Sequence, residues 1–426
     1  MPATVVVGMQ WGDEGKGKIV DFIAAQADVV ARFSGGVNAC HTVVVDGKET
    51  RFSVVPSGAL RPRPTLVLTD GIVVEPYVLA HEVGRLRESH GFDAKRLLIG
   101  RNAIVTFPYH IRLDKASEKM AGQHAVGTTG WGIGPTRVDQ VARQGVRIFE
   151  YLDPDFMKER IWARTAKYLT HAALLTKMDG ILYYTEEVYN EVRETLGGCV
   201  IDTVTYLNEA IDSGQHVLFE GSQGALLDLV HGFYPHVTST CTLAGGACAS
   251  AGVGPTKITA VIGVVKAYSS RICQGPMPTE LIGKENTRLV ELGHEYRHTT
   301  DIPQRVGWLD LVALRYTVML NGVSSIALTK LDVLDAFDEI KVCVAYKRKG
   351  QVYTDLPADL LCGEYEPVYE TLQGWKSPCP EARSHADLPS QAQVYLHFIE
   401  DFVRVPIRII SVGRDRSQTF RISEER

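Results

Sequence analysis

The chain has 426 residues, of which 45% are apolar and 22% are charged, which is ordinary for a globular protein. Its formal net charge of −5 gives no basic field that would attract nucleic acid or a membrane surface. No apolar run reaches the ~18 residues of a membrane span and the start does not look like a signal peptide, so we expect a cytoplasmic protein. The eight cysteines include no Cys-x-x-Cys pair, which predicts reduced thiols and argues against a zinc site.

Short apolar runs alternate with amphipathic segments along the whole chain. The first run, Thr4–Val7, leads into a glycine-rich loop, and the apolar residues from Ile19 to Ile23 then follow helical spacing. Further buried strands are expected at Thr65–Leu68, Leu97–Ile99, His216–Phe219, Thr259–Val265, Ser325–Leu328 and Pro406–Ser411. Amphipathic helices are expected at Pro76–Glu88, Phe156–Thr176, Glu187–Leu196, Leu309–Leu320 and Gln391–Arg404. This alternation predicts an α/β fold with a mostly parallel sheet.

A late segment, Lys341–Tyr353, has Arg348-Lys-Gly350 at its centre and predicts a small antiparallel hairpin. The sequence contains no internal repeat, no low-complexity tract and no linker rich in Pro, Gly and Ser. We therefore expect one elaborated domain over residues 1–426, not several.

The segment Gly12-Asp-Glu-Gly-Lys-Gly-Lys18, called the phosphate loop below, has the spacing G-x-x-x-x-G-K of nucleotide-binding loops. The next residue is Ile19, so the hydroxyl that usually holds Mg²⁺ is missing. Backbone N–H groups at the start of the following helix, with Lys16 and Lys18, can cradle an anion. A glycine turn with solvated lysines is the alternative, and the flanking strand and helix disfavour it. Asp13, an acid beside phosphates, is a candidate Mg²⁺ ligand or general base.

Two more glycine-rich loops can contribute to a nucleotide site. Ser34-Gly-Gly-Val-Asn-Ala-Cys-His-Thr42 contains Asn38 and His41, which can hydrogen-bond a substrate or a transferring phosphoryl group. Gly127-Thr-Thr-Gly-Trp-Gly-Ile-Gly-Pro135 offers backbone amides and two hydroxyls, as phosphate and ribose pockets do. Taken singly, each loop is also compatible with an ordinary tight turn.

The tetrapeptide Thr329-Lys-Leu-Asp332 directly follows the predicted strand Ser325–Leu328. The carboxylate of Asp332 can accept hydrogen bonds from N1–H and the exocyclic amine of guanine, a donor pair that adenine lacks, while Lys330 covers the ring. Ligands gather at this end of parallel strands, although a simple strand-end cap is the alternative. Ser411-Val-Gly413, after the last strand, can close the other side of the base.

Together these segments resemble the adenylosuccinate synthetase family from residue 3 to about residue 420. The likeness is carried, in family order, by QWGDEGKGKIVD near the start, GTTGWGIGP, Phe219–Gly224, Tyr234–Thr238, Thr329–Asp332 and Tyr365–Tyr369. It implies a P-loop NTPase-like single domain with a large, mostly parallel central sheet and flanking helices, working as a homodimer. It also implies a ligase that uses GTP as co-substrate and one Mg²⁺ ion to join L-aspartate to IMP, giving adenylosuccinate, GDP and phosphate.

The resemblance implies a role for each member of the catalytic centre. Asp13 takes the proton from N1 of hypoxanthine, and the O6 atom so activated attacks the γ-phosphate of GTP. Phosphorylation turns an amide oxygen, a poor leaving group, into a good one. Asp13 and the main-chain carbonyl of Cys40 hold the metal, and His41 stabilises the transferring phosphoryl group.

The resemblance also implies named segments within the domain: the phosphate loop in residues 1–25, the Mg²⁺ and histidine loop in 34–42, the nucleotide loop in 120–145, the amino-donor loop in 295–308, and the guanine pocket in 325–335 and 406–415. The remaining implied contacts form three sets. GTP is bound by Gly12, Glu14, Gly15, Lys16, Gly17, Lys18, Thr42, Lys330, Asp332, Ser411 and Gly413. The purine nucleotide is bound by Asn38, Thr128, Thr129, Gln223 and Thr238, with Arg143 reaching into the partner subunit's site. The amino donor meets Thr299, Thr300, Asp301, Gln304, Arg305 and Trp131.

The amino-donor loop departs from the family, which has Thr-Thr-Gly and then a run of arginines before Gly-Trp-Leu-Asp. Here residues 299–310 read TTDIPQRVGWLD, so Arg305 alone remains, and Trp131 stands where another arginine is usual. An aspartate dianion would meet a like charge at Asp301 and too few cations. We therefore expect a changed amino donor or a modified nucleotide in a specialised pathway, unless the loop has merely drifted or Arg271 or Arg297 fills in.

Two other classes of function stay open at this point. The chain can be a phosphotransferase that stops at the phosphorylated nucleotide, or a regulatory GTPase that uses nucleotide binding alone. A switch protein has no use for a base and a histidine beside a second nucleotide pocket, so Asp13 and His41 favour the ligase.

Overall fold

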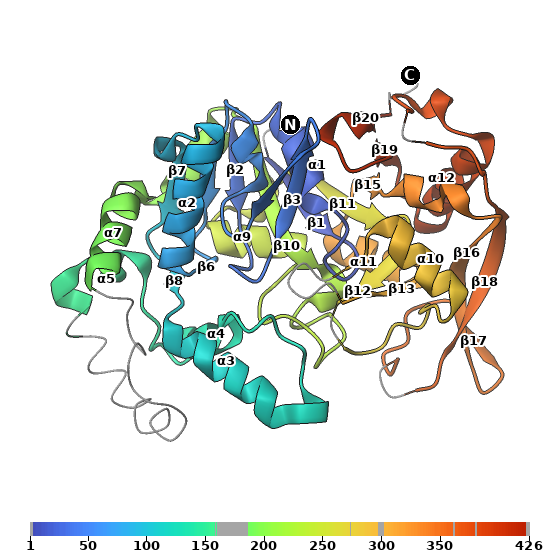
Figure 1. Ribbon diagram of the computed structural model, residues 1–426, viewed down its shortest axis with the longest axis horizontal. Coiled ribbons are helices and arrows are strands. Elements are labelled where there is room, and N and C mark those ends of the chain that lie inside the picture. Colours follow the sequence, from blue (N-terminus) through green and yellow to red (C-terminus); the bar gives the residue numbers. More distant parts are fainter. Residues whose placement is uncertain are drawn as a thin grey trace.

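Ten strands form one large sheet in the computed structural model, in the order β20-β19-β15-β11-β1-β10-β2-β5-β7-β9 (Figure 1). The structure describes residues 3–157, 159, 186–272, 274–296, 302–360, 363–379 and 381–422, without the side chains of residues 123 and 186. The neighbours are parallel except for β19 and β20, which are antiparallel. In sheet order the strands are Thr419–Arg421, Ile407–Ser411, Ser325–Thr329, Ala260–Lys266, Ala3–Gly8, Val217–Gly224, Val29–Arg32, Thr65–Leu68, Leu97–Gly100 and Val200–Ile201.

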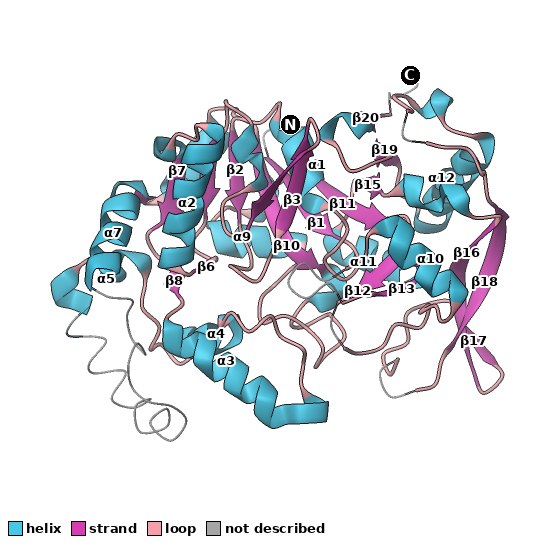
Figure 2. Ribbon diagram, viewed as in Figure 1, coloured by secondary structure: helices cyan, strands magenta, loops and turns pink. Residues whose placement is uncertain are grey.

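Helices cover both faces of this sheet (Figure 2). One core includes residues of α8 (Thr203–Asp212), α9 (Ala244–Ala251), α11 (Leu311–Asn321) and α12 (Ser390–Val403). The other includes residues of α1 (Lys16–Ala24), α2 (Pro76–His90) and α7 (Glu186–Leu196). Side chains alternate across a strand, so Val5 and Val7 of β1 enter the first core and Val6 enters the second. The remaining α-helices of the described residues are α3 (Pro108–Ala121), α4 (Ile133–Val141), α5 (Ile148–Tyr151) and α10 (Lys284–Gly293).

In the described part of the chain, four smaller sheets accompany the large one. The antiparallel hairpin of β3 (His41–Val45) and β4 (Lys48–Phe52) follows the second glycine-rich loop. The others are β6 (Val73–Val74) with β8 (Ile104–Val105), β12 (Ser269–Arg271) with β13 (Arg305–Gly307), and β14 (Leu309–Asp310) with β16 (Glu339–Arg348), β17 (Gln351–Tyr353) and β18 (Glu366–Gln373). Figure 1 shows β16–β18 at the opposite end of the molecule from α5 and α7.

The predicted α/β architecture and all the predicted strands are confirmed, and β10 continues past its predicted end at Phe219 to Gly224. The predicted hairpin Lys341–Tyr353 is present as β16 and β17. The predicted helix Leu309–Leu320 begins two positions late, because Leu309–Asp310 pair with β16. Most of the predicted helix Phe156–Thr176 lies outside the described residues. In the part of the chain that is described, no helix is long and apolar enough to cross a membrane.

Candidate active site

The phosphate loop runs from the end of β1 to the start of α1. Gly15, at the N-cap of α1, has φ +85°, a left-handed conformation that favours glycine. Glu14 fixes the loop: its Oε1 accepts hydrogen bonds from the N–H groups of Gln10 (2.8 Å) and Gly12 (2.9 Å). Its Oε2 lies 2.7 Å from Nζ of Lys16, which also donates to the Gly12 carbonyl at 3.0 Å. Glu14 and Lys16 thus hold the shape of the cradle in this structure.

Asp13 sits at the base of this loop. Its Oδ2 atom is enclosed and has no hydrogen-bond partner among the described residues. Burial raises the pKa of Asp13, and the ammonium group of Lys266 opposes the increase. An enclosed carboxylate oxygen without a partner is costly to bury, so this atom is suited to bind a cation or to take up a proton.

His41 is the first residue of β3 and packs closely against the phosphate loop. The contact leaves no room for a side chain at Gly17, where an added Cβ atom would lie only 2.8 Å from Cβ of His41. Its Nδ1 lies 2.5 Å from Oε1 of Glu220 and 3.1 Å from Oγ of Ser57. Glu220 also accepts from N–H (2.9 Å) and Oγ (2.6 Å) of Ser57. The Nε2 atom is enclosed and has no partner within the described residues. The histidine is therefore held by one nitrogen and keeps the other for a ligand.

The electrostatics of this pair follow from its depth in the protein. Burial lowers the pKa of His41, and the hydrogen bond to Glu220 opposes the change. Burial alone would raise the pKa of Glu220, but its bonds to His41 and the nearby guanidinium of Arg32 lower it overall. Glu220 is therefore a carboxylate that accepts from Nδ1 and fixes the direction of the ring.

The predicted guanine pocket joins the phosphate loop through Lys18. The Nζ atom of Lys18 donates to Oγ of Ser411 and to the carbonyl of Gly413, at the end of β19. Burial lowers the pKa of Lys18 to about 8, although the Asp332 carboxylate opposes the decrease. Asp332 follows β15, and its enclosed Oδ1 atom has no partner in the described part of the chain. The structure thus brings Lys18, Asp332, Ser411 and Gly413 together.

A buried cluster of charges links this pocket to Asp13. Glu295 accepts from Nζ of Lys266 (3.0 Å to each oxygen), from Nζ of Lys330 (2.8 Å) and from the hydroxyl of Tyr268 (2.5 Å). Burial would raise the pKa of Glu295, but the two lysines lower it to about 2. Glu295 thereby holds Lys266 within electrostatic range of Asp13, and it holds Lys330 beside the predicted guanine pocket.

The residues predicted to bind the purine nucleotide lie on several elements. Gln223, near the end of β10, has φ +57°. It lies close to Gly12 of the phosphate loop, since a Cβ atom added to Gly12 would come within 3.3 Å of the Cα of Gln223. The side-chain amide of Gln223 is enclosed and has no hydrogen-bond partner among the described residues. Asn38 accepts from the N–H of Gly36 at 3.0 Å. Thr238 donates its backbone N–H to the carbonyl of Leu227 at 2.8 Å. Gln223 is therefore placed beside the phosphate loop with an amide able to bind a ligand.

The loop Gly127–Pro135 holds a carboxylate of its own chain. Glu118 of α3 accepts from the N–H groups of Val126 (3.2 Å), Gly127 (2.8 Å) and Thr128 (3.0 Å). The hydroxyl of Thr128 donates to Asp114 at 2.9 Å, and Thr129 is exposed. These backbone amides thus hold a carboxylate of the same chain, and the predicted role of the loop in binding a nucleotide stays a prediction. Arg143, just after α4, is exposed with φ +61°.

The amino-donor loop is described only in part, since residues 297–301, including Thr299, Thr300 and Asp301, lie outside the described residues. Arg305 binds Glu280, with Nε 2.8 Å from Oε1, and its Nη1 donates to the carbonyl of Gly275 at 2.7 Å. Gln304 is buried and donates Nε2 to the carbonyl of Tyr296 at 3.4 Å. Trp131, in the loop before α4, is 39% exposed. The retained arginine is thus already neutralised by a carboxylate.

Two more predicted positions, Cys40 and Thr42, flank His41 in the sequence. Thr42, next to His41, has an enclosed hydroxyl without a partner among the described residues, and Cys40 is exposed immediately before β3. Glu220, Lys266 and Glu295 received no role from the sequence. Lys266 could have been predicted as a site residue, because it is a charged residue at the end of an apolar strand. The same feature led to the prediction for Asp332. Glu220 and Glu295 carried none that a single sequence reveals.

Comparisons with known proteins agree over the whole chain. The model of the adenylosuccinate synthetase family matches residues 5–420. The chain is 46% identical to the adenylosuccinate synthetase of a Cyanothece species, covering 100% of this chain and 95% of that protein. It is 44% identical to the enzyme of Heliobacterium modesticaldum, covering 100% of both.

Solved structures show the same relationship. The fully ligated adenylosuccinate synthetase from Plasmodium falciparum matches with a TM-score of 0.92 at 33% identity, covering 99% of this chain and 100% of that one. The succinoaminodeoxyadenylate synthetase of cyanophage S-2L, at 19% identity and a TM-score of 0.64, shares the fold alone.

Proposed function

Because the chain belongs to the adenylosuccinate synthetase family, we propose that it is a GTP-dependent carbon–nitrogen ligase of the cytoplasm. It phosphorylates the 6-oxo group of a purine nucleotide and replaces it with an amine, as in making adenylosuccinate from IMP and L-aspartate. The chain works as a homodimer, with residues 1–426 of each subunit as one domain. The observation that carries this proposal is the enclosed Oδ2 atom of Asp13, which has no partner among the described residues at the base of the phosphate loop.

Asp13 is the general base in this scheme. A carboxyl group whose pKa is raised by burial is a stronger base than a solvated one, so it takes the N1 proton of a 6-oxopurine more readily. Lys266, the opposing charge, keeps Asp13 ionised before the proton arrives. The O6 atom, now carrying the negative charge, attacks the γ-phosphorus of GTP, and GDP leaves.

The donor set fits Mg²⁺. The Oδ2 atom of Asp13 and the main-chain carbonyl of Cys40 would hold the ion, and substrate phosphates supply further oxygen ligands, as is usual for Mg²⁺. Among the described residues there is no group of three or more His, Cys, Asp and Glu side chains that could form an all-protein metal cage. When bound, the ion neutralises charge on the phosphates of GTP.

His41 and the loop amides stabilise the phosphoryl group during transfer. The Nε2 atom of His41 is the ring nitrogen that does not contact Glu220, and it is enclosed. It can therefore donate to a phosphoryl oxygen once the ring is protonated. Negative charge on the transferring group favours that protonation, and the Glu220 carboxylate stabilises the resulting imidazolium. The Gly15–Lys18 amides bind the remaining phosphates at the N-terminus of α1, and the Lys18 side chain joins this loop to the guanine pocket through Ser411 and Gly413.

The test of this proposal is phosphate release from GTP and Mg²⁺ in the presence of IMP, with and without L-aspartate. A ligase releases phosphate with turnover only when nucleotide and amine are both present. A phosphotransferase would accumulate phosphorylated nucleotide without any amine, and a GTPase would need neither IMP nor amine.

A second candidate, a member of the family with a different amino donor, is favoured by one observation. Arg305 is paired with Glu280, and the positions before it are Ile302, half exposed, and Gln304, buried against Tyr296. A free guanidinium is the group that binds a carboxylate bidentately. Each such contact missing from the donor site weakens binding by roughly 1.5–3 kcal/mol.

A panel of amines and purine nucleotides, assayed by phosphate release, separates the two candidates. For the second candidate, L-aspartate has a KM orders of magnitude above that of a preferred amine. The combined variant Asp301→Gly, Ile302→Arg, Pro303→Arg and Gln304→Arg then improves aspartate use, whereas Ile282→Arg, which adds a cation at an exposed position, does not. Tight use of aspartate by the unaltered chain would leave the first candidate alone.

A further inference from the structure

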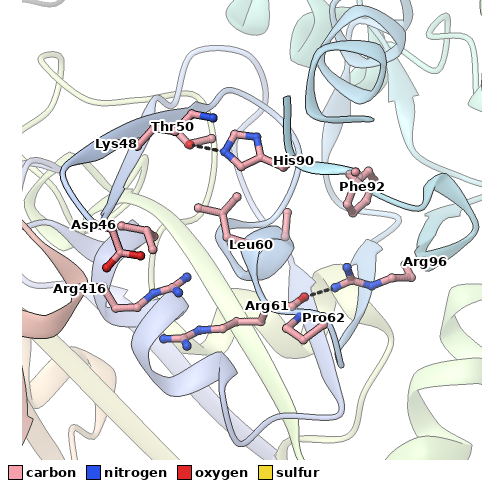
Figure 3. Close-up of a pocket in the computed structure, with 13 residues that line it drawn as sticks. Asp46, Lys48, Thr50, Leu60, Arg61, Pro62, His90, Phe92, Arg96 and Arg416 are labelled. Carbon is pink, nitrogen blue, oxygen red and sulfur yellow. Dashed lines mark hydrogen bonds between the residues drawn. The ribbon is translucent and has the colours of Figure 1, made fainter. Parts of the chain in front are cut away.

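A cavity of about 530 Å³ has neither Asp13 nor His41 among the residues that line it (Figure 3). The β3–β4 hairpin, η1 (Ser57–Leu60), the end of α2 and η9 (Arg416–Gln418) surround it. Four cationic side chains line it, Lys48, Arg61, Arg96 and Arg416, against one carboxylate, Asp46. The chain as a whole has a net charge of −5, so this concentration of positive charge is local.

Two of the arginines share a single buried carboxylate. Nε and Nη2 of Arg416 each lie 2.5 Å from an oxygen of Asp21. Nε of Arg61 donates to the Asp21 carbonyl at 3.0 Å and its Nη2 lies 3.4 Å from Oδ2. Each guanidinium is thus fixed by one edge, and its Nη1 makes no hydrogen bond within the described part of the chain. One positive charge of the pair stays uncompensated.

Lys48 and Arg96 have no carboxylate partner in the part of the chain that the structure describes. Arg96 donates Nε and Nη2 to the carbonyl of Pro64, at 3.1 and 2.9 Å, and Nη2 also to the carbonyl of Arg61. Nζ of Lys48 donates to the carbonyl of Ser89 at 3.4 Å. The neighbouring His90 responds to these charges: burial, then Lys48 and Arg85, lower its pKa. Among the described residues these two cations form no salt bridge, although the Asp93 carboxylate opposes the lowering of the Arg96 pKa by burial and Asp46 lies in the same cavity wall.

The rest of the wall is apolar. Leu60, Pro62 and the buried Phe92 line the cavity, and the guanidinium of Arg96 stands 5.5 Å from the ring centre of Phe92. Figure 3 shows Arg61 and Arg416 on one side of the cavity and Lys48, Thr50 and His90 on the other, with Leu60 between them. Ligand pockets of ~300–1,000 Å³ hold molecules of nucleotide or drug size. Fixed guanidinium groups bind phosphate well.

We propose that this cavity binds a phosphate-bearing small molecule of nucleotide size, at a site separate from those of GTP and the purine nucleotide. Nη1 of Arg61, Arg96 and Arg416 and Nζ of Lys48 bind the phosphate oxygens. Leu60, Pro62 and Phe92 contact the apolar part of the ligand.

The experiment is calorimetric titration of the full chain with inorganic pyrophosphate, after GDP and IMP have been added to saturation. Binding of GDP and IMP is measured in the first step, so a failure of the proposed function is seen separately. One further pyrophosphate then binds per chain. In Lys48→Gln/Arg96→Gln its dissociation constant rises about tenfold or more, because two charge-assisted contacts are lost. Arg63→Gln, an exposed arginine that pairs with Asp28 outside the cavity, leaves it unchanged.

Hydrogen exchange of the unaltered protein gives a second readout that does not depend on the folding of a variant. Pyrophosphate slows exchange in residues 46–50 and 90–96 if it occupies the cavity. UDP in place of pyrophosphate separates the two sources of phosphate: tighter binding of UDP identifies a nucleotide, and tighter binding of pyrophosphate identifies an inorganic anion. No additional equivalent bound, equal affinity in the double variant, or protection of residues 12–18 instead would overturn the proposal.

Discussion

The Nδ1 atom of His41 lies 2.5 Å from Oε1 of Glu220, a residue 179 positions further along the chain. This contact leaves Nε2 as the nitrogen available to the phosphoryl group. Glu220→Gln keeps the shape but removes the charge that stabilises the imidazolium form of His41, so we expect kcat to fall about 100-fold, with little change in the KM for GTP. Steady-state kinetics measure both constants. The exposed Glu209→Gln serves as control, and a rise in KM at unchanged kcat would contradict the role of Glu220.

Asp13→Ala should remove turnover while GTP still binds. Loss of a general base typically costs about 10²–10⁴-fold in rate, and loss of a metal ligand adds to it. Stopped assays of phosphate release, beside equilibrium binding of GTP, check the two halves of this expectation. Asp212→Ala, an exposed acid paired with Lys257, should behave as the unaltered chain. Near-normal activity of Asp13→Ala would remove the proposed mechanism.

The lowered pKa of Lys18 predicts that the use of GTP weakens at alkaline pH. Burial lowers its pKa to about 8, so the ammonium form is present below that pH and is lost as pH rises through it. We expect kcat/KM for GTP, which reports the free enzyme, to decline above about pH 8. Lys18→Arg should abolish the decline, since a guanidinium stays charged, and Lys95→Arg on the surface should not. An unchanged decline in Lys18→Arg would assign the limit to another group.

Asp332 should control the choice between GTP and ATP. Removing its charge in Asp332→Asn weakens charged hydrogen bonds to the guanine edge, so the ratio of kcat/KM for GTP to that for ATP should fall about 10- to 100-fold. Burial raises the pKa of Asp332, so in the unaltered chain the preference should also decline as pH falls, sooner than for a solvated aspartate. The exposed Asp338→Asn is the control. Equal use of ATP by the unaltered chain would refute the guanine assignment.

Arg143 should act in the neighbouring subunit of the dimer. Arg143→Leu and Asp13→Ala subunits are each inactive alone, but a mixed dimer contains one site with both residues intact. Random mixing in equal amounts should therefore restore about one quarter of the activity of the unaltered dimer. Activity is measured after co-refolding or co-expression, and mixing Arg143→Leu with itself gives the baseline. Absence of complementation would place Arg143 within its own site.

Strands were predictable where a continuous apolar run is buried on both faces, as in β5 and β15. The predicted boundary of an element was wrong where contact with a residue far away in the sequence determines it. Leu309 belongs to a helical pattern, yet it pairs with Val342 of β16, and Asp310 caps α11 by accepting from the N–H of Ala313 at 3.0 Å. The two-residue strands β6 and β8 have no local signal, because each exists only through the other.

The candidate site was predictable to the extent that its residues lie in loops with special spacing. Glycine spacing identified the phosphate loop, and the end of an apolar strand identified Asp332. Glu220 was not predictable, because it lies inside β10 and its function comes from a contact across the sheet. Glu295 lies in a loop after α10, in a segment without a recognisable motif. Its partner Lys266 is the last residue of β11, and its partner Lys330 directly follows β15. Spacing along a chain reveals loops, but not pairings between elements.

The position of β1 in the sheet has a consequence for synthesis of the protein on the ribosome. β1 is made first, yet its two neighbours are β10 and β11, which end at Gly224 and Lys266. Pairing over such long sequence separations is slow, and it cannot begin before those strands exist. The phosphate loop therefore has no rigid base until more than half of the chain has left the ribosome. A nascent chain that ends before Lys266 carries the whole glycine-rich motif and still lacks the nucleotide site.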